Sequence, residues 1–455
     1  MSRLVVLSVA LAIVAGLATA PALGSQHART LTRITHPSPN TSDEFTGGVN
    51  QPHALAGTAG GKVLVGVKND DVGGTSSGAA YLFNPLTGAL ETTFTNPTPA
   101  AFDQFGVAVA GSGANNVVIG AFTDDTHRTN AGAAYLFDTA GPNGNLLATM
   151  LSHRPSKNGR MNDSFGVSIA SNGSVIAVGA THDLNNDSGA VFLYDSAGVK
   201  ISGGIISNPT PQPNDHFGWS IAMNDNYMLV GSIDDDGDAG TGIADEGVAH
   251  LFDTSGTLLQ TFKNPNAGSV GEFGYDVSLM DAPGKGSLAA GTYALVSDPQ
   301  AAGTAGIVYV FDMSGNLVKS HVGPGADRFG KGVSGIDGTN LFIAGGPRQD
   351  SPKTDGGAVY LVDLKTGQIE HKYEMEDTST AQMYLGNSVG VIHGADTAGG
   401  TAIDAIALGG SRWAGLDDTV DEAGAAWSYA IPEPGTLTAA LALAGLTLAR
   451  RRRRA

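Results

Sequence analysis

The stretch Asp103-Gln104-Phe105-Gly106-Val107-Ala108-Val109-Ala110 decides the fold, because its pattern returns along the whole chain. An acidic residue, a variable residue, Phe and Gly are followed by alternating apolar residues. The aromatic positions 45, 105, 165, 217, 273, 329 and 384 are 52 to 60 residues apart, which is typical of a repeat architecture. The other six copies are Asp43-Glu44-Phe45, Asp163-Ser164-Phe165-Gly166, Asp215-His216-Phe217-Gly218, Gly271-Glu272-Phe273-Gly274, Asp327-Arg328-Phe329-Gly330 and Tyr384-Leu385-Gly386.

Each repeat carries four strand patterns in a constant order. Apolar strands such as 107–110 and 117–120 come first, a Gly-Ala-x-Tyr-Leu-Phe strand such as 132–137 is third, and a more polar strand such as 256–262 is fourth. β-Branched and aromatic residues between Gly, Asn, Asp and Pro are typical of strands. The sequence therefore predicts an all-β, seven-bladed β-propeller of four-stranded antiparallel blades.

The two ends of the repeat region predict how the ring closes. The last repeat stops after its third strand, at Tyr429-Ala430, whereas residues 29–37 resemble the fourth-strand segment 90–97. We expect the N-terminal strand to complete the last blade, because this pairing removes an open sheet edge.

Residues 1–24 have the pattern of a secretory signal peptide. One early cation, Arg3, precedes an apolar run over 4–18 and small residues near 18–24, and we expect cleavage between Ala20 and Gly24. The alternative is a short buried helix. The chain is thus divided into a signal peptide (1–24), the propeller (25–430) and a C-terminal segment (431–455).

The C-terminal segment contains a Pro-Glu-Pro triplet, an apolar stretch over 437–449 and a basic end, and this order resembles the PEP-CTERM sorting signal. The resemblance implies a short transmembrane helix that anchors the precursor transiently in the inner membrane until an exosortase-type enzyme cleaves near the triplet. A permanent anchor is the alternative. As a helix, 437–449 would be about 20 Å long, short of the ~30 Å hydrocarbon core, and the basic cluster favours a cytoplasmic end. The motif residues are Pro432, Glu433, Pro434 and Arg450, Arg451, Arg452, Arg453, Arg454.

The composition is acidic and free of cysteine. The chain has 25 Lys and Arg against 43 Asp and Glu, which gives a net charge of −18. Most charged residues in the signal peptide and the C-terminal segment are basic, so the propeller itself is more acidic than the whole chain. This balance argues against nucleic acid or anionic lipid as a partner and favours cations or basic surfaces. Without cysteine there is neither a disulfide framework nor thiol chemistry.

The repeat itself resembles the FG-GAP repeat of the integrin α-subunit propeller, over residues 43–429. The resemblance implies a binding platform, with calcium loops between the first and second strands of several blades. In this chain those loops are too short or too poor in carboxylates to supply six or more oxygen ligands, so calcium is not expected there. They span 111–116, 171–174, 224–227 and 335–340.

Carboxylates gather instead between the second and third strands. Because strands alternate in direction, these loops and the Asp of each motif should share one face, which we expect to be strongly negative. We expect each motif Asp to accept hydrogen bonds from amides one or two residues further on. The acids are Asp70-Asp71, Asp124-Asp125, Asp183 with Asp187, Asp234-Asp235-Asp236 with Asp238, Asp350 with Asp355, and Asp417-Asp418 with Asp421-Glu422.

One of these loops has the alternating acids of a calcium site. Asp234, Asp236 and Asp238 alternate around Gly237, but Gly240 stands where a closing carboxylate belongs, so Asp245 or Glu246 would have to substitute. The two interpretations are a Ca²⁺ site formed by Asp234, Asp236, Asp238 and Asp245, and a solvated acidic loop.

Motifs of known catalytic chemistry are absent from the sequence: it has no His-Glu-x-x-His, no Gly-x-Ser-x-Gly and no phosphate loop. We interpret His127, His182 and His216 as exposed loop residues, and three tryptophans are too few for a sugar-binding row. The leading hypothesis is an exported, non-catalytic binding or structural protein of the cell surface or extracellular matrix, whose partner is surface polysaccharide or another surface protein. The alternative is a secreted polysaccharide hydrolase or lyase that uses carboxylates around the channel.

Overall fold

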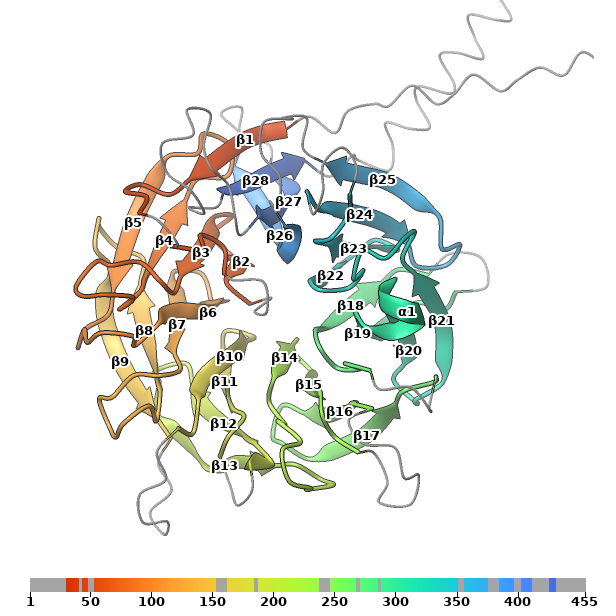
Figure 1. Ribbon diagram of the computed structural model, residues 1–455, viewed down its shortest axis with the longest axis horizontal. Helices are drawn as coiled ribbons and strands as arrows, with labels where there is room; N and C mark the ends of the chain where they lie inside the picture. The colour runs from red at the N-terminus through yellow and green to blue at the C-terminus, as the bar shows by residue number, and fades with distance from the viewer. Residues whose placement is uncertain are drawn as a thin grey trace, which may run out of the picture.

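The computed structural model describes twelve segments of the chain, and the strands in them form seven separate four-stranded sheets. The sheets are arranged as blades around a central opening, with the first strand of each blade innermost (Figure 1). All neighbouring strands within a blade are antiparallel, as the register of blade 2 shows. The predicted seven-bladed, all-β propeller is confirmed. The described residues are 30–40, 43–47, 53–152, 162–183, 187–236, 246–266, 271–284, 288–350, 356–374, 384–396, 402–410 and 425–430.

The blades are numbered in chain order, and each is given from its innermost strand outward. Blade 1 contains β2 (Leu55–Gly57), β3 (Val63–Val67), β4 (Ala79–Phe83) and β5 (Leu90–Thr95); blade 2 contains β6 (Phe105–Ser112), β7 (Asn116–Ala121), β8 (Ala133–Asp138) and β9 (Asn145–Leu151); blade 3 contains β10 (Phe165–Ser171), β11 (Val175–Ala180), β12 (Ala190–Asp195) and β13 (Lys200–Ser207); blade 4 contains β14 (Ser220–Met223), β15 (Tyr227–Ser232), β16 (Val248–Asp253) and β17 (Leu258–Lys263). Blade 5 contains β18 (Val277–Ala282), β19 (Gly291–Asp298), β20 (Ile307–Asp312) and β21 (Leu317–Val322); blade 6 contains β22 (Val333–Ile336), β23 (Leu341–Gly346), β24 (Ala358–Asp363) and β25 (Ile369–Glu374); blade 7 contains β26 (Leu385–Asp396), β27 (Ala402–Gly410), β28 (Ala425–Ala430) and the N-terminal β1 (Thr30–Thr35).

The N-terminal strand closes the ring, as predicted. Strand β1 pairs antiparallel with β28, with Arg33 opposite Trp427 and Thr35 opposite Ala425, and Figure 1 shows the two strands side by side. In addition, the Ser428 hydroxyl donates a hydrogen bond to the carbonyl oxygen of Pro85 in blade 1. The last blade is therefore completed by residues from both ends of the chain.

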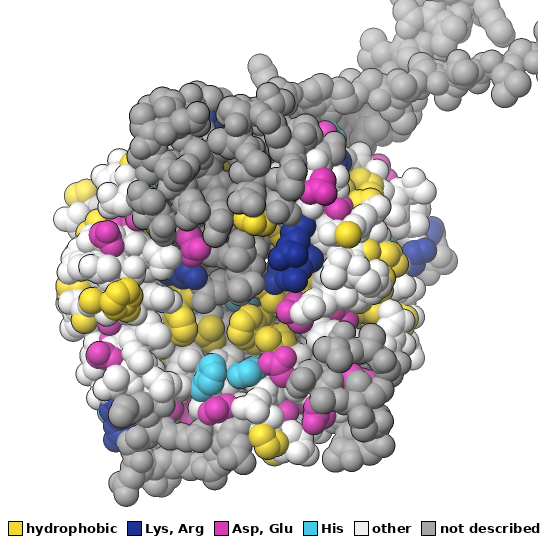
Figure 2. Space-filling model, viewed as in Figure 1, with side chains coloured by type: hydrophobic (Ala, Val, Ile, Leu, Met, Phe, Trp, Pro, Cys, Tyr) yellow, Lys and Arg dark blue, Asp and Glu magenta, His cyan; other side chains and the backbone are white. Residues whose placement is uncertain are grey.

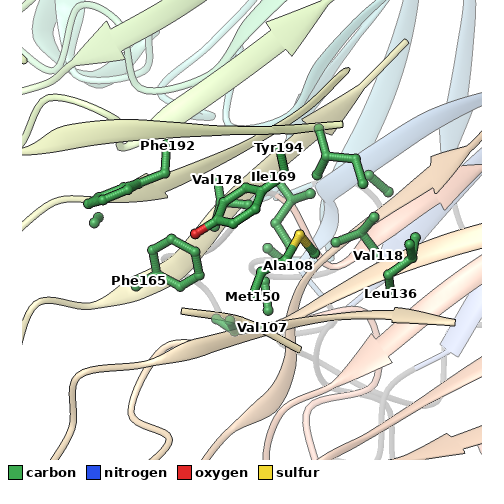
Figure 3. Packing of buried hydrophobic residues seen from close by; sticks show 14 of the residues in the cluster. Val107, Ala108, Val118, Leu136, Met150, Phe165, Ile169, Val178, Phe192 and Tyr194 are labelled. Atoms are coloured by element: carbon green, nitrogen blue, oxygen red, sulfur yellow. The ribbon is translucent and has the colours of Figure 1, made fainter. Parts of the chain in front are cut away.

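The hydrophobic core lies between the blades rather than within one central mass. Seven clusters of buried side chains are present among the described residues, and each combines residues of two neighbouring blades. In the core between blades 2 and 3, Phe165 of the repeat motif packs edge-on against Phe192 of its own blade, with ring centres 5.4 Å apart (Figure 3). It shares this core with Leu136 and Met150 of blade 2. Burying such a side chain contributes about 1.5–3 kcal/mol. The motif Phe therefore helps to hold two blades together.

At five of the seven interfaces between blades, a pair of glycines allows the backbones of adjacent blades to touch. A Cβ on Gly120, in the second strand of blade 2, would lie 2.0 Å from the carbonyl oxygen of Gly166 in blade 3. Gly166 itself has a φ of 95°, a conformation that other residues rarely adopt. Position 120 thus requires glycine because the two backbones lie so close together, and position 166 requires it because of its positive φ. Equivalent contacts join Gly66 to Gly106, Gly179 to Gly218, Gly231 to Gly274 and Gly345 to Gly386.

The last repeat is in a different register from the predicted one. We expected Tyr384 at the aromatic position, but Leu385 forms the parallel bridge to Gly357 that Phe105 forms to Gly78. Tyr384 has a φ of 51° and corresponds to the variable residue Gln104, with a φ of 56°. The prediction was wrong by one residue because leucine fills the interblade position, where Leu385 is buried.

Helical structure is minimal in the described residues. A single short turn, α1 (Ala301–Thr304), lies between the second and third strands of blade 5. None of the described helical structure has the length and apolar character needed to span a bilayer. The predicted signal peptide (1–24) and the C-terminal segment (431–455), with its expected transmembrane helix, lie outside the described residues.

Candidate functional site

Buried carboxylates meet at the face of the propeller that carries the repeat motifs, and blade 2 shows the arrangement most completely. The side-chain amide of Asn96 donates to Asp103 Oδ2 at 2.8 Å and to Asp124 Oδ2 at 3.3 Å. The hydroxyl of Tyr135 donates to the same oxygen of Asp124 at 2.6 Å. We call such a group a carboxylate cluster. It joins the end of one blade's outer strand to the motif and the second-to-third loop of the next blade.

Blade 1 has the same cluster with a histidine in place of the asparagine. His36 Nε2 lies 2.9 Å from Asp70 Oδ2 and 3.9 Å from Asp43 Oδ2. The Tyr81 hydroxyl donates to Asp70 at 2.5 Å. His36 follows β1, so this cluster also ties the ring-closing strand to blade 1.

Blade 4 contains a third complete cluster, in which a histidine replaces the tyrosine. The Asn208 amide donates to Asp215 Oδ2 at 2.7 Å and to Asp235 Oδ2 at 3.0 Å, and His250 Nε2 lies 3.9 Å from Asp235. We did not predict His36 or His250 as cluster residues. Aligning the repeats would have revealed them, because they occupy the places of Asn96 and Tyr135.

The acids that form the clusters are buried and so do not add to the strongly negative face that we expected. The loops and motif acids do share one face, but Asp103 is 1% exposed and Asp124 fully buried, whereas the next acid, Asp125, is exposed. The motif Asp of blade 2, Asp103, accepts from the amide of Ala100, three residues before it, and from that of Asp125 in the second-to-third loop, whereas we expected the amides one or two residues further on. The variable residue after it, Gln104, has a left-handed backbone conformation with a φ of 56°.

Burial changes the titration of the clustered acids. It raises the pKa of Asp103 and Asp43 to about 6 and that of Asp215 to about 7. Burial also acts to raise the pKa of Asp70, but hydrogen bonds from its histidine and tyrosine neighbours outweigh this effect and lower it. Each of these clusters links two blades through hydrogen bonds, and its buried carboxylates are either protonated or paired with hydrogen-bond donors.

The predicted calcium loop is only partly within the described residues. Asp234 and Asp236 are described, whereas Asp238 and Asp245 lie outside the described ranges. Asp234 Oδ2 is 2.5 Å from His216 Nδ1, and the His216 ring centre is 4.9 Å from that of His182. Within the described residues, no three His, Asp or Glu side chains are grouped as metal ligands. The calcium site stays a prediction.

The three loop histidines differ in their surroundings. His127 is exposed, as we interpreted it, but His182 and His216 are half-buried and lie against each other. His216 is held by its contact with Asp234. The interpretation as simple exposed loop residues is therefore wrong for this pair.

The central channel contains a cavity of about 300 Å³ that is lined by the innermost strands of all seven blades. Its lining includes two carboxylates, Asp276 and Asp337, and two histidines, His53 and His393. Asp276 accepts hydrogen bonds from the backbone amides of Val277 and Val333. His53 Nδ1 lies 3.9 Å from its carboxylate.

The electrostatics of the cavity favour neutral side chains. Burial raises the pKa of Asp276 well above its ordinary value and lowers the pKa of His53 to about 4. Desolvation disfavours the charged form of each group, so neither supplies a strong ionic contact. Neither residue lies in a motif that could be recognised from the sequence.

The fold and the carboxylate clusters define a seven-bladed β-propeller whose neighbouring blades are joined by buried Asp and Asn side chains. Residues 90–137, 156–194 and 210–252 match the FG-GAP repeat family, so the chain carries FG-GAP repeats, as the resemblance predicted. The first span runs from β5 to β8 and contains the whole cluster of blade 2. A comparison with curated proteins gave no match.

Proposed function

We propose that this protein is an exported, non-catalytic binding module of the cell surface or extracellular matrix, with a surface polysaccharide or another surface protein as its partner. One observation carries this proposal: the carboxylates that converge in the clusters are occupied in joining blades. Asp103 and Asp124 are buried and bound to Asn96, Ala100 and Tyr135. A glycosidase needs two carboxyl groups that face its substrate.

Delivery to the surface rests on the two terminal signals. We propose that the signal peptide directs export and that an exosortase-type enzyme recognises the triplet Pro432-Glu433-Pro434 in an inner-membrane-anchored precursor. Replacing the triplet by alanines should retain the protein in the membrane fraction, whereas the control Pro142→Ala should leave release unchanged. Equal release of both variants would contradict the sorting proposal.

The alternative is a hydrolase or lyase that acts in the channel. Asp276 supports it, because a buried carboxyl group of raised pKa beside a cavity is suited to act as a general acid. Its two backbone hydrogen bonds favour a structural role instead.

A glycan array combined with an assay of reducing-sugar release separates the two functions. The binding module should retain particular glycans without releasing new reducing ends. Release that is lost in Asp276→Asn, while the glycan is still bound, would refute the binding-module proposal and establish the enzyme.

A further inference from the structure

The residue that follows the motif glycine changes character around the ring. It is valine in blades 2 and 3, at Val107 and Val167, but Trp219, Tyr275 and Lys331 in blades 4, 5 and 6. Each of these three precedes by two positions a residue that lines the channel cavity. They therefore lie between the cavity and the face that carries the motifs.

These three side chains contact one another across the blades. The rings of Trp219 and Tyr275 have centres 5.9 Å apart, and Lys331 Nζ lies 3.7 Å from the centre of the Tyr275 ring. Lys331 is 2% exposed, and its nearest carboxylate oxygen, Glu272 Oε2, is 4.0 Å from Nζ. We call Trp219, Glu272, Tyr275, Arg328 and Lys331 the channel-rim cluster.

The rim is basic although the chain as a whole carries a charge of −18. Burial, together with the charges of Arg328 and Arg348, lowers the pKa of Lys331 to about 7, although the Glu272 carboxylate acts to raise it. The backbone places these residues together: the Lys331 amide donates to the carbonyl of Arg328 at 3.2 Å, and the Arg348 amide donates to that of Asp327, the residue before Arg328, also at 3.2 Å. Glu272 is the carboxylate beside them. Figure 2 shows Lys and Arg side chains gathered at the edge of the central hollow.

Several buried polar atoms of the rim have no hydrogen-bond partner in the part of the chain that the structure describes. They include three donors, Trp219 Nε1, Tyr275 OH and Arg328 Nε, and one acceptor, Glu272 Oε2. Leaving such an atom unsatisfied costs roughly 1–3 kcal/mol, so buried polar groups are normally paired. A ligand that supplies both acceptors and a donor would satisfy the rim.

We propose that the channel rim binds an anionic sugar, whose carboxylate is held by Arg328 and Arg348 and whose hydroxyl donates to Glu272. Guanidinium groups match the planar geometry of a carboxylate and hold it through paired hydrogen bonds. Inorganic sulfate offers acceptors only and would leave the glutamate unsatisfied. This inference rests on the proposed glycan-binding function and assigns to it a class of ligand, the uronic acids.

Calorimetric titration of the full-length protein with trigalacturonic acid tests the inference. Arg328→Gln and Arg348→Gln should each weaken binding at least tenfold, whereas Arg128→Gln, at an exposed arginine of blade 2, should leave it unchanged. Arg348 is exposed, so its variant should fold like the parent, which thermal unfolding verifies. Maltotriose, a neutral trisaccharide, should not bind.

Three other outcomes would overturn the inference. Equal binding by the arginine variants would place the binding site elsewhere, and no binding of trigalacturonic acid would rule out the uronic acids as ligands. Equal displacement by sulfate would show that the rim is a simple anion site. If the glycan array still retains neutral glycans in any of these cases, the proposed function stands and only the ligand class fails. Shortening of trigalacturonic acid by the protein would instead refute the proposed non-catalytic function.

Discussion

The carboxylate clusters predict a large and specific loss of stability when their central amide is removed. In Asn96→Ala, Asp103 and Asp124 each lose a donor, at 2.8 and 3.3 Å, and the backbone amide of Thr98 loses its acceptor Oδ1. A hydrogen bond to a charged group contributes roughly 1.5–3 kcal/mol and a neutral one about 1. Both carboxylates keep other donors, Ala100 N and the Tyr135 hydroxyl. We therefore expect a loss of about 3–5 kcal/mol.

Asn145→Ala is the matched control, because the Asn145 amide also donates to a carboxylate, that of Asp138, but in an exposed pair. Exposed contacts of this kind contribute less than about 1 kcal/mol. Urea unfolding followed by tryptophan fluorescence measures both free energies of unfolding. A loss below about 1 kcal/mol for Asn96→Ala, or equal losses for the two variants, would refute the view that the clusters hold adjacent blades together.

Three further predictions concern pH, backbone contact and calcium. Burial raises the folded-state pKa of Asp215 from 3.8 to about 7, so its contribution to stability is complete below pH 4 and is lost as the pH rises towards 7. Asp215→Asn should therefore reduce the fall in unfolding free energy between pH 4 and 8 by about 2 kcal/mol, and an unchanged pH profile in urea titrations would contradict this. In the same assay, Gly120→Ala, whose Cβ would lie 2.0 Å from the Gly166 oxygen, should lower the free energy of unfolding by about 3 kcal/mol. The control Gly60→Ala, whose Cβ would lie 3.3 Å from its nearest atom, should lower it by less than about 1 kcal/mol, and similar losses would argue against the glycine contact. Calcium should raise the thermal unfolding midpoint of the parent but not of Asp234→Asn/Asp236→Asn, and an identical midpoint with calcium and with chelator would remove the metal hypothesis.

The sequence predicts the blades well because each motif residue is required by the packing or the backbone conformation at its own position. Phe165 fills an interblade core, Gly166 adopts a positive φ, and Gly120 leaves room for it. Most of these requirements recur from blade to blade and leave a visible period; the exceptions include Leu385 in place of the Phe and Ser297 in place of the first glycine. Ring closure by β1 was predictable for the same reason, because the segment repeats the pattern of β5.

The parts that could not be predicted depend on contacts between repeats. The burial of Asp124 requires Asn96, 28 residues earlier and in the preceding blade, and nothing in the acidic loop itself indicates this partner. The channel rim is a second case. Trp219, Tyr275 and Lys331 are 56 residues apart in the sequence, and only the curvature of the ring brings them together. Leu385 escaped notice because a leucine there breaks the aromatic pattern without changing the packing.

The fate of a bound glycan tests the central claim, non-catalytic binding, most directly. The protein is incubated with a glycan that it retains on the array, and the glycan is then recovered and its chain length determined by mass spectrometry. We predict saturable retention and recovery of the glycan at its original length. Recovery of shortened or unsaturated chains that are not formed by Asp276→Asn would contradict the claim and assign the chemistry to the channel.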